Sequence, residues 1–281
     1  MTDLGDLKEP EFVRLVHGER RVGPALASVS RRWQGDRECF LMVSPHDDDV
    51  VLGAGLLIQL MQEQGVPVHI LVVTDGSMGY CDPAERDNIT EVRRAETYRS
   101  YGILGVPRER IVFLGFPSGE ISSFLGRFPA PSYSTLNIAG YTGLQNAFTY
   151  WLRRIRPTQC FLPTNNDWHP AHRTVYDEFM ISLFHASGQI WPELGKPLEK
   201  ISYLCEMAVY CDFAAPPTLR IRTPRAYLDR KLEAIRAFAS QKQIGMLVEN
   251  IRRAGPVEIL RAVEYRFYDP GRYYDLFERP R

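Results

Sequence analysis

Four short apolar runs, each followed by a stretch of helical periodicity, place the strongest constraint on the fold. The runs occupy residues 38–43, 68–73, 111–114 and 159–162, and stretches at 53–64, 89–104, 144–156 and 170–184 follow them. Unbroken apolar runs are typical of parallel strands whose sheet is covered by helices on both faces. The alternation predicts an α/β fold, a Rossmann-like doubly wound and mostly parallel sheet. Extra C-terminal elements are expected: a strand at 200–210 and helices at 225–240 and 242–253.

No repeat, low-complexity tract or linker divides the chain, so we expect one domain over residues 1–281. Residues 1–36 are polar and rich in arginine, with weak helical periodicity, and we expect an N-terminal extension on the surface. Residues 246–281 form an aromatic-rich C-terminal segment. Because aromatic side chains bury large areas, we expect this segment to pack on the domain's own core. A subunit interface in a homo-oligomer is the alternative.

The overall charge gives no support for a nucleic-acid or membrane partner. Lysine plus arginine and aspartate plus glutamate balance at 34 each, so no net field favours a polyanion. No apolar run approaches the roughly 20 residues that a membrane span needs. The five cysteines contain no CxxC pair, and their odd number argues against a disulfide framework. We therefore expect a cytoplasmic protein with neither kind of partner.

A histidine and three consecutive aspartates follow the first apolar run, as His46-Asp47-Asp48-Asp49. Carboxylates this close together repel one another and raise one another's pKa unless a cation neutralises them. A mixture of imidazole and carboxylate suits a divalent metal ion better than it suits a salt-bridge cluster. In a doubly wound sheet, ligands bind beyond the carboxyl ends of the strands, and this cluster lies at such an end.

A second pair of histidines begins the helix that follows the fourth apolar run. His169 and His172 are three residues apart, on roughly one face of that helix. Both imidazoles could address one cavity together with His46 and an aspartate of the first cluster. Two histidines and a carboxylate are enough for a catalytic zinc ion, which keeps a position for water. The carboxylate and the histidine left over match the general base and electrophilic helper of amide hydrolysis.

These motifs resemble those of the LmbE/PIG-L family of zinc-dependent N-deacetylases, over about residues 38–245. The family's His-Pro-Asp-Asp-Glu motif and its Leu-Gly-x-Gly continuation correspond to residues 46–55. This spacing aligns Asp48 with the family's general base and Asp49 with its metal-binding aspartate. Further matches are Thr74-Asp75-Gly76, Arg93-Arg94-Ala95-Glu96, Ile103-Leu104-Gly105-Val106 and Ser240-Gln241.

The resemblance implies one zinc ion (Zn2+) per chain, held by His46, Asp49 and His172. It implies that Asp48 accepts a proton from metal-activated water and that His169 polarises the carbonyl or protonates the leaving amine. The implied reaction is hydrolysis of an N-acetyl amide, on a small acetamido sugar or glycoconjugate. The sugar comes from the resemblance, since the residues themselves specify only metal and water.

Three further residues are candidates for substrate binding. Arg93 stands at the family's spacing from Glu96. Asp75 lies at a strand end that faces the expected cavity, although Asp-Gly is also common turn chemistry. Asp47 could be a carboxylate in the outer shell of the metal or a solvated loop residue. Residues 117–140, rich in Pro, Ser and Gly, are expected to help shape the pocket.

The sequence departs from the family pattern at three positions. Asp47 replaces the usual proline, Val50 the usual glutamate, and Ala171 the aspartate commonly placed before the final histidine. None of these removes a proposed ligand, base or acid, but the change at Ala171 could remove a partner that orients the catalytic histidine. Two alternatives stay open: a catalytically altered metal-binding member of the family, and a magnesium-dependent phosphoacceptor or phosphatase.

Overall fold

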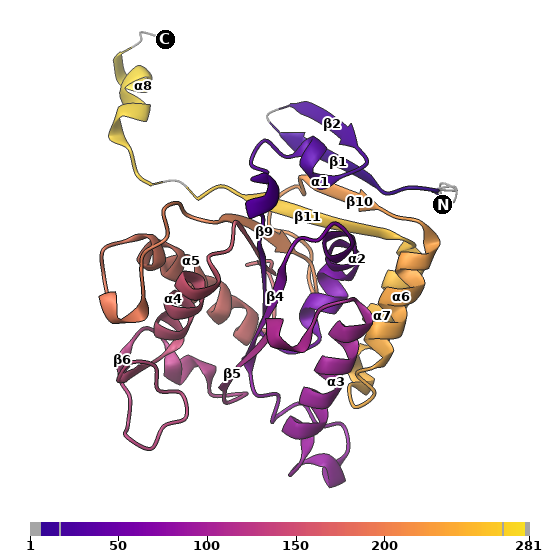
Figure 1. The fold of residues 1–281 in the computed structure, drawn as a ribbon, viewed down its shortest axis with the longest axis vertical. Helices are drawn as coiled ribbons and strands as arrows, with labels where there is room; N and C mark the ends of the chain where they lie inside the picture. Colours follow the sequence, from indigo (N-terminus) through magenta and orange to yellow (C-terminus); the bar gives the residue numbers. More distant parts are fainter. Residues whose placement is uncertain (1–6, 17, 266, 279–281) are drawn as a thin grey trace.

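The computed structural model describes residues 7–16, 18–265 and 267–278, and its centre is a nine-stranded sheet (Figure 1). The strand order is β2-β1-β10-β11-β9-β8-β3-β4-β5, and the five strands at the β5 end are all parallel. Every apolar run that predicted a strand belongs to this parallel half, which confirms the predicted fold class. Its members are β3 (Phe40–Ser44), β4 (Val68–Thr74), β5 (Ile111–Phe116), β8 (Gln159–Pro163) and β9 (Tyr203–Met207).

The other half of the sheet is antiparallel and includes part of the predicted N-terminal extension. Its strands are β1 (Glu11–Val16), β2 (Glu19–Gly23), β10 (Leu219–Arg222) and β11 (Val257–Val263). The expectation of helical structure near residues 12–16 is therefore wrong, because β1 pairs with β10 on one side and β2 on the other. Only the short helix α1 (Leu26–Val29) follows in this region.

Helices cover both faces of the sheet, as a doubly wound fold requires. One layer holds α2 (Asp49–Glu63), α3 (Ile89–Ile103), α6 (Arg225–Arg236) and α7 (Gly245–Ala254); the other holds α4 (Leu144–Ile155) and α5 (Pro170–Ser187) (Figure 1). Alternate side chains of strand β3 pack against the two helix layers. Phe40 and Met42 pack into the first, and Leu41 and Val43 into the second.

Helix α2 is kinked one turn after it begins, where Ala54 has non-helical torsions (φ −142°, ψ 20°). Glycines flank the kink because neighbouring elements come close to the backbone there. A Cβ atom on Gly53 would lie 2.9 Å from the sulfur of Met207, and one on Gly55 would lie 2.9 Å from Cγ of Lys231. The Leu-Gly-x-Gly stretch thus lets β9 and α6 approach the helix that carries Asp49.

The C-terminal segment contributes α7 and β11 to the body and then leaves it. Helix α8 (Tyr274–Glu278) stands away from the other elements in Figure 1. The ring of Phe267 packs edge-on against that of Phe184, with ring centroids 5.7 Å apart. Tyr268 and Phe277, however, are 82% and 83% exposed. The expectation that this aromatic run packs on the domain's own core is therefore wrong for the residues described.

Residues 117–140 form a loop held by a second, two-stranded sheet of β6 (Phe128–Pro129) and β7 (Tyr141–Thr142). Phe124 of this loop packs edge-on against Phe116 at the end of β5, at 5.2 Å. The loop is thereby fixed beside the carboxyl ends of the parallel strands. Among the described helices, none is long and apolar enough to cross a membrane.

Candidate active site

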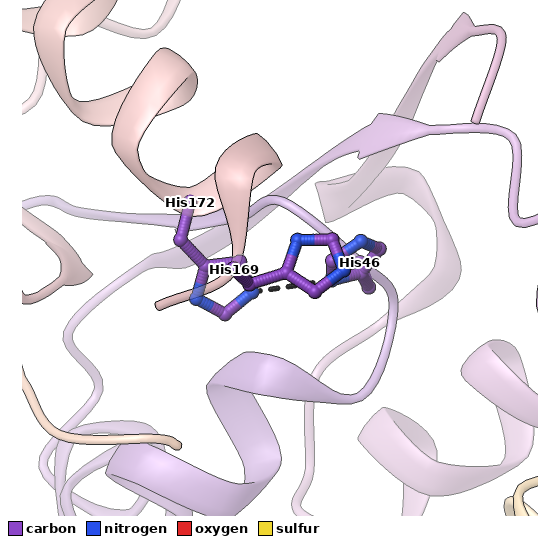
Figure 2. A group of neighbouring side chains, drawn as sticks. All are labelled: His46, His169 and His172. Atoms are coloured by element: carbon purple, nitrogen blue, oxygen red, sulfur yellow. Dashed lines mark hydrogen bonds between the residues drawn. The ribbon is translucent and has the colours of Figure 1, made fainter. Parts of the chain in front are cut away.

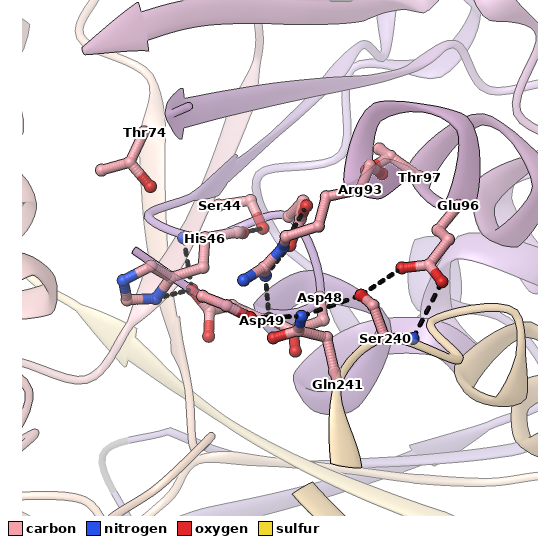
Figure 3. Close-up of polar contacts among 12 residues, drawn as sticks. Ser44, His46, Asp48, Asp49, Thr74, Arg93, Glu96, Thr97, Ser240 and Gln241 are labelled. Carbon is pink, nitrogen blue, oxygen red and sulfur yellow. Dashed lines mark hydrogen bonds and ion pairs between the residues drawn. The ribbon is translucent and has the colours of Figure 1, made fainter. Parts of the chain in front are cut away.

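The loop between β3 and α2 is held from two sides, which places the acidic cluster at the carboxyl end of the sheet (Figure 3). Both the backbone N–H and the hydroxyl of Thr74, the last residue of β4, donate to the carbonyl of Pro45, at 3.1 and 2.8 Å. The hydroxyl of Tyr101 in α3 donates to the carbonyl of Asp47 at 2.9 Å. Helix α2 begins at Asp49. The loop geometry is thus set by neighbouring elements and not by the loop alone.

Three side-chain atoms of His46, Asp49 and His172 form a small triangle. Oδ2 of Asp49 lies 3.2 Å from Nδ1 of His46 and 3.0 Å from Nε2 of His172. The two nitrogens lie 3.1 Å apart, the contact drawn as a dashed line in Figure 2. Asp49 and His172 have fully buried side chains, whereas that of His46 is partly exposed. Residues 126 positions apart thus meet at one point.

This triangle fits a tetrahedral metal ion. With zinc–ligand bonds of about 2.0 Å, neighbouring ligand atoms of a tetrahedral site lie about 3.3 Å apart, close to the separations of 3.0 to 3.2 Å found here. Oδ1 of Asp49 is buried and has no hydrogen-bond partner among the residues described. An orphaned carboxylate oxygen at such a site is what a bound cation would satisfy.

Asp49 and His172 strongly perturb each other's ionisation. Burial disfavours the charged form of both, but their mutual attraction outweighs it. The pKa of His172 rises to about 9, and the pKa of Asp49 lies well below its usual range. A metal ligand must bind in its deprotonated form, so an ion at this site would compete with the proton on His172.

His169 is the N-cap residue of helix α5. Its Nδ1 accepts a hydrogen bond from the backbone N–H of Ala171 at 3.2 Å, so Nε2 carries the proton of the neutral ring. Burial and the nearby rings of His46 and His172 lower the pKa of His169 to about 4. His169 is therefore a neutral hydrogen-bond donor at pH 7.

A second ligand set is compatible with the positions of the three rings. One nitrogen from each of His46, His169 and His172 lies within 4.8 Å of the others, and Figure 2 shows the three side chains converging. The set with Asp49 is more compact, with separations of 3.0 to 3.2 Å. It also leaves His169 free for a different role.

Asp48 precedes Asp49 of the triangle and is buried. Burial raises its pKa to about 7, against the opposing charge of Arg93, whose Nη2 is 3.7 Å from Oδ1 of Asp48. That oxygen makes no hydrogen bond to any residue described. A carboxylate with a pKa near neutrality can both accept and release a proton under working conditions.

The Arg93-x-x-Glu96 motif connects α3 to two other elements, as Figure 3 shows. Arg93 forms a two-pronged ion pair with Asp47, through Nε at 2.8 Å and through Nη2. Glu96 accepts hydrogen bonds from the backbone N–H and the hydroxyl of Ser240, at 2.9 and 2.7 Å. Arg93, Asp47 and Glu96 are all buried. Ser240-Gln241 is thus fastened to the site by Glu96.

A cavity of about 290 Å³ opens beside these residues, and its lining includes His46, Asp48, Arg93, His169 and Tyr210. Of the other predicted substrate-binding residues, Asp47 is turned toward Arg93. Asp75 accepts hydrogen bonds from the backbone N–H groups of Ser77 and Ser118, at 3.0 and 2.9 Å. Asp75 therefore joins the loops after β4 and β5.

Asp167 is a residue of this site to which the sequence analysis gave no role. Its Oδ2 lies 3.2 Å from Nδ1 of His172, and its Oδ1 accepts the backbone N–H of His169 at 2.9 Å. Asp167, in the segment after β8, thus places a carboxylate beside the proposed ligand His172, whereas the proposed catalytic histidine, His169, donates only its backbone N–H to it. An aspartate two residues before a helix-capping histidine is a turn signal that could have indicated this.

Tyr210 is the second residue that was missed. Its ring stacks on His169 with centroids 6.0 Å apart, and it lies 5.1 Å from the ring of His172. Tyr210 ends the stretch 200–210 that was predicted as a strand and lies just beyond β9, and nothing in that stretch singles it out as a site residue. It forms part of the wall of the cavity.

The fold is that of an α/β protein, and a cluster of potential metal ligands follows the carboxyl ends of its parallel strands. The chain belongs to the PIG-L family: the family model described as "PIG-L: GlcNAc-PI de-N-acetylase" matches residues 41–182. This confirms the resemblance read from the motifs. The match covers α2 and most of α5, and it includes all three residues of the triangle.

Known proteins with related sequence or fold include two named deacetylases. A diacetylchitobiose deacetylase of Thermococcus kodakarensis is 39% identical over 82 residues, which span 29% of this chain and only 30% of that relative. The structure of N,N'-diacetylchitobiose deacetylase from Pyrococcus horikoshii, in complex with an inhibitor, is 23% identical, with a TM-score of 0.64 over 85% of this chain and 86% of that one.

A third protein of the same fold has a different activity. GalB from Pseudomonas putida, a 4-carboxy-2-hydroxymuconate hydratase, is 20% identical, with a TM-score of 0.58 over 83% of this chain and 98% of that one. Structural likeness at these identities shows the fold alone. The reaction has to be argued from the residues of the site.

Proposed function

We propose that this protein hydrolyses the N-acetyl amide of a small acetamido sugar or glycoconjugate, with one zinc ion held by His46, Asp49 and His172. The observation that carries the proposal is the triangle of ligand atoms beside a buried carboxylate, Asp48, on the wall of a cavity. Two imidazoles favour zinc over magnesium, which prefers oxygen ligands. This weighs against the magnesium-dependent phosphatase alternative.

The bound ion would act as a Lewis acid and would lower the pKa of a water molecule in the cavity. Asp48 then accepts the proton of that water, a role to which its pKa of about 7 suits it. The positive charge of Arg93, 3.7 Å away, stabilises the ionised form of the Asp48 carboxylate despite its burial. The proton can afterwards pass from Asp48 toward the leaving nitrogen.

His169 would serve the acyl oxygen. Because its Nδ1 is occupied by the N–H of Ala171, the Nε2–H is the donor that this ring, part of the cavity lining, can offer to a substrate. A donor held there can stabilise negative charge that develops on the carbonyl oxygen. Tyr210, stacked on the ring, and Asp167, bonded to the backbone of His169, hold the imidazole in place.

The remaining predicted residues have supporting places in this proposal. Arg93 reaches the wall of the cavity and neutralises Asp47, whereas Asp75 holds two loops beside the cavity. We propose them as residues that shape the substrate pocket. The single domain over residues 1–281, the homo-oligomer and the cytoplasmic location remain predictions.

The proposal is tested with Asp48→Asn in purified protein. Metal content is measured by mass spectrometry, and amine release is measured with N-acetylglucosamine and diacetylchitobiose. We expect zinc to stay bound while turnover falls by about 100-fold or more, the usual contribution of a general base. Full turnover in the variant would refute the role of Asp48.

The same preparation separates the alternatives. Zinc at about one ion per chain without amine release from several acetamido sugars would favour the catalytically altered family member. Magnesium in place of zinc, with phosphate release from p-nitrophenyl phosphate, would favour the phosphatase. Two substrates, N-acetylglucosamine and diacetylchitobiose, are used because the absence of amine release from one sugar would not exclude hydrolysis of another.

A further inference from the structure

A second cavity, of about 470 Å³, lies at the opposite end of strand β9 from the candidate active site. Tyr203, the first residue of β9, lines this cavity, whereas Tyr210, beyond the other end of the strand, lines the first one. Its walls come from β1, β2, the turn after α1, the segment before β10 and the end of β11. Neither the family motifs nor the proposed reaction involves these elements.

Arginine dominates the lining of this cavity. Glu264 is the one acidic side chain among the described lining residues. Five arginines border the cavity: Arg14, Arg21, Arg31, Arg32 and Arg261. Three of the five are paired with carboxylates. Glu19 accepts from Arg21 and Arg31 at 2.7 and 3.1 Å, and Arg261 donates to the buried Glu206 at 2.7 Å.

Arg14 and Arg32 have no carboxylate partner within ion-pair distance among the residues described. Arg14 is only 4% exposed, and its Nη2 donates to the hydroxyl of Tyr203. Both guanidinium groups lie over the ring of Tyr203, at 5.2 and 4.6 Å from its centroid. Burial of the Arg14 cation without a counter-charge is costly, because the hydroxyl and ring of Tyr203 replace only part of its lost hydration.

Much of the remaining lining is apolar, although Ser30 and Thr218 also belong to it. Val29, Pro216 and Ala262 contribute to it along with the ring of Tyr203. A volume of this size is in the range of small-molecule sites, which combine an apolar wall with a few polar groups that orient the ligand. The cavity thus offers the buried guanidinium group of Arg14, the exposed guanidinium group of Arg32 and apolar lining residues.

We propose that this cavity binds a small phosphorylated molecule, with its phosphoryl oxygens against Arg14 and Arg32. Guanidinium groups pair with phosphoryl oxygens through parallel hydrogen bonds, which makes arginine well suited to this recognition. The ligand supplies the counter-charge that Arg14 lacks in the protein. The remainder of the ligand lies along Val29 and Ala262.

The test is isothermal titration of the full chain with inorganic phosphate, ribose 5-phosphate and uncharged ribose. We expect saturable binding of the phosphate-bearing probes and none of ribose. Arg32→Gln should weaken that binding by about tenfold or more, as loss of a charge-assisted contact does. Because phosphate also binds metal ions, this variant is what assigns the signal to the second cavity.

Arg108→Gln is the matched control. Arg108 is exposed and lies over the ring of Tyr98 at 4.1 Å, an arginine–tyrosine contact like that of Arg32, but outside the second cavity. Binding should be unchanged in this control. Arg14→Lys keeps the buried charge but loses the planar guanidinium group, so a folded variant should bind the phosphate-bearing probes more weakly. If Arg14→Lys does not fold, the result for Arg32→Gln decides the test.

Several outcomes decide the proposal. Binding of both phosphate-bearing probes, lost in Arg32→Gln and kept in Arg108→Gln, supports it. Binding of inorganic phosphate alone supports the phosphoryl contact and identifies the free ion as its source. No saturable binding up to about 10 mM, an equal loss in both variants, or equal binding of ribose overturns it.

Discussion

Replacing Glu258 with alanine should destabilise the protein by about 3–5 kcal/mol, the usual cost of removing one partner from a buried ion pair. Glu258 lies on β11, and both it and its partner Lys231 on α6 have side chains only 3% exposed. Its carboxylate accepts the Nζ of Lys231 at 2.7 Å and the backbone N–H groups of Leu56 and Leu57 at 2.6 and 2.9 Å.

The kink in α2 explains why these two N–H groups need Glu258. A continuous helix would pair them with the carbonyls of Leu52 and Gly53, four residues earlier. The non-helical torsions of Ala54 interrupt that pattern, so the second part of the helix starts with free donors. In Glu258→Ala, one ammonium and two N–H groups would be left buried together without an acceptor.

The contributions can be separated with a double-mutant cycle. Lys231→Met should cost less than Glu258→Ala, about 2 kcal/mol, because the remaining carboxylate keeps both backbone donors. In the double variant no charge is buried. We therefore expect the double variant to lose about 2 kcal/mol less free energy of unfolding than the sum of the losses in the two single variants.

The assay is urea unfolding, followed by circular dichroism and by tryptophan fluorescence so that coincident transitions can be checked. Glu249→Ala is the control, because its ion pair with Arg252 on α7 is half exposed and should contribute less than about 1 kcal/mol. A loss below about 1 kcal/mol in Glu258→Ala would refute the reasoning. So would single losses that add up to the double loss within about 0.5 kcal/mol.

Three further changes test other contacts. Asp167→Asn should weaken zinc binding about 10- to 100-fold, measured by chelator competition, because the carboxylate beside Nδ1 of His172 is lost. Gly53→Ala should lower stability by about 1 kcal/mol or more through contact with Met207, and thermal unfolding should show a smaller or reversed effect in a Met207→Ala background. Burial lowers the pKa of His69, so stability should fall as the pH drops from about 6.5 toward that lowered pKa; the urea midpoint of His69→Gln should vary less over this window.

The parallel half of the sheet could be predicted because each strand carries its own signal. Strands buried on both faces must be apolar at every position, and turn residues bound them. The antiparallel half carries no such signal. In β10 (Leu219–Arg222) the arginines alternate with buried apolar residues over only four positions, too few to distinguish a strand from a loop. Its structure depends on pairing with β1 and β11.

Within the site, contacts between neighbours in sequence could be predicted and most distant ones could not. His46 and His172 meet because β3 and β8 are adjacent in the sheet, so the carboxyl ends of both strands reach the same edge. The bond from Ser240 to Glu96 joins residues 144 positions apart. No periodicity encodes that bond, which depends on how α3 and α6 pack.

The change at Ala171 shows how a local motif and the folded site can differ. By position in the motif, the missing carboxylate suggests a histidine that nothing orients. In the fold, Asp167 approaches the site from the end of β8 and lies within 3.2 Å of Nδ1 of His172. What a histidine ligand requires is a carboxylate at its second nitrogen, and the chain position that supplies it is immaterial. The departure at Ala171 is therefore no argument against metal binding, and the proposed ligand set beside Asp48 supports the proposed hydrolase over the catalytically altered alternative.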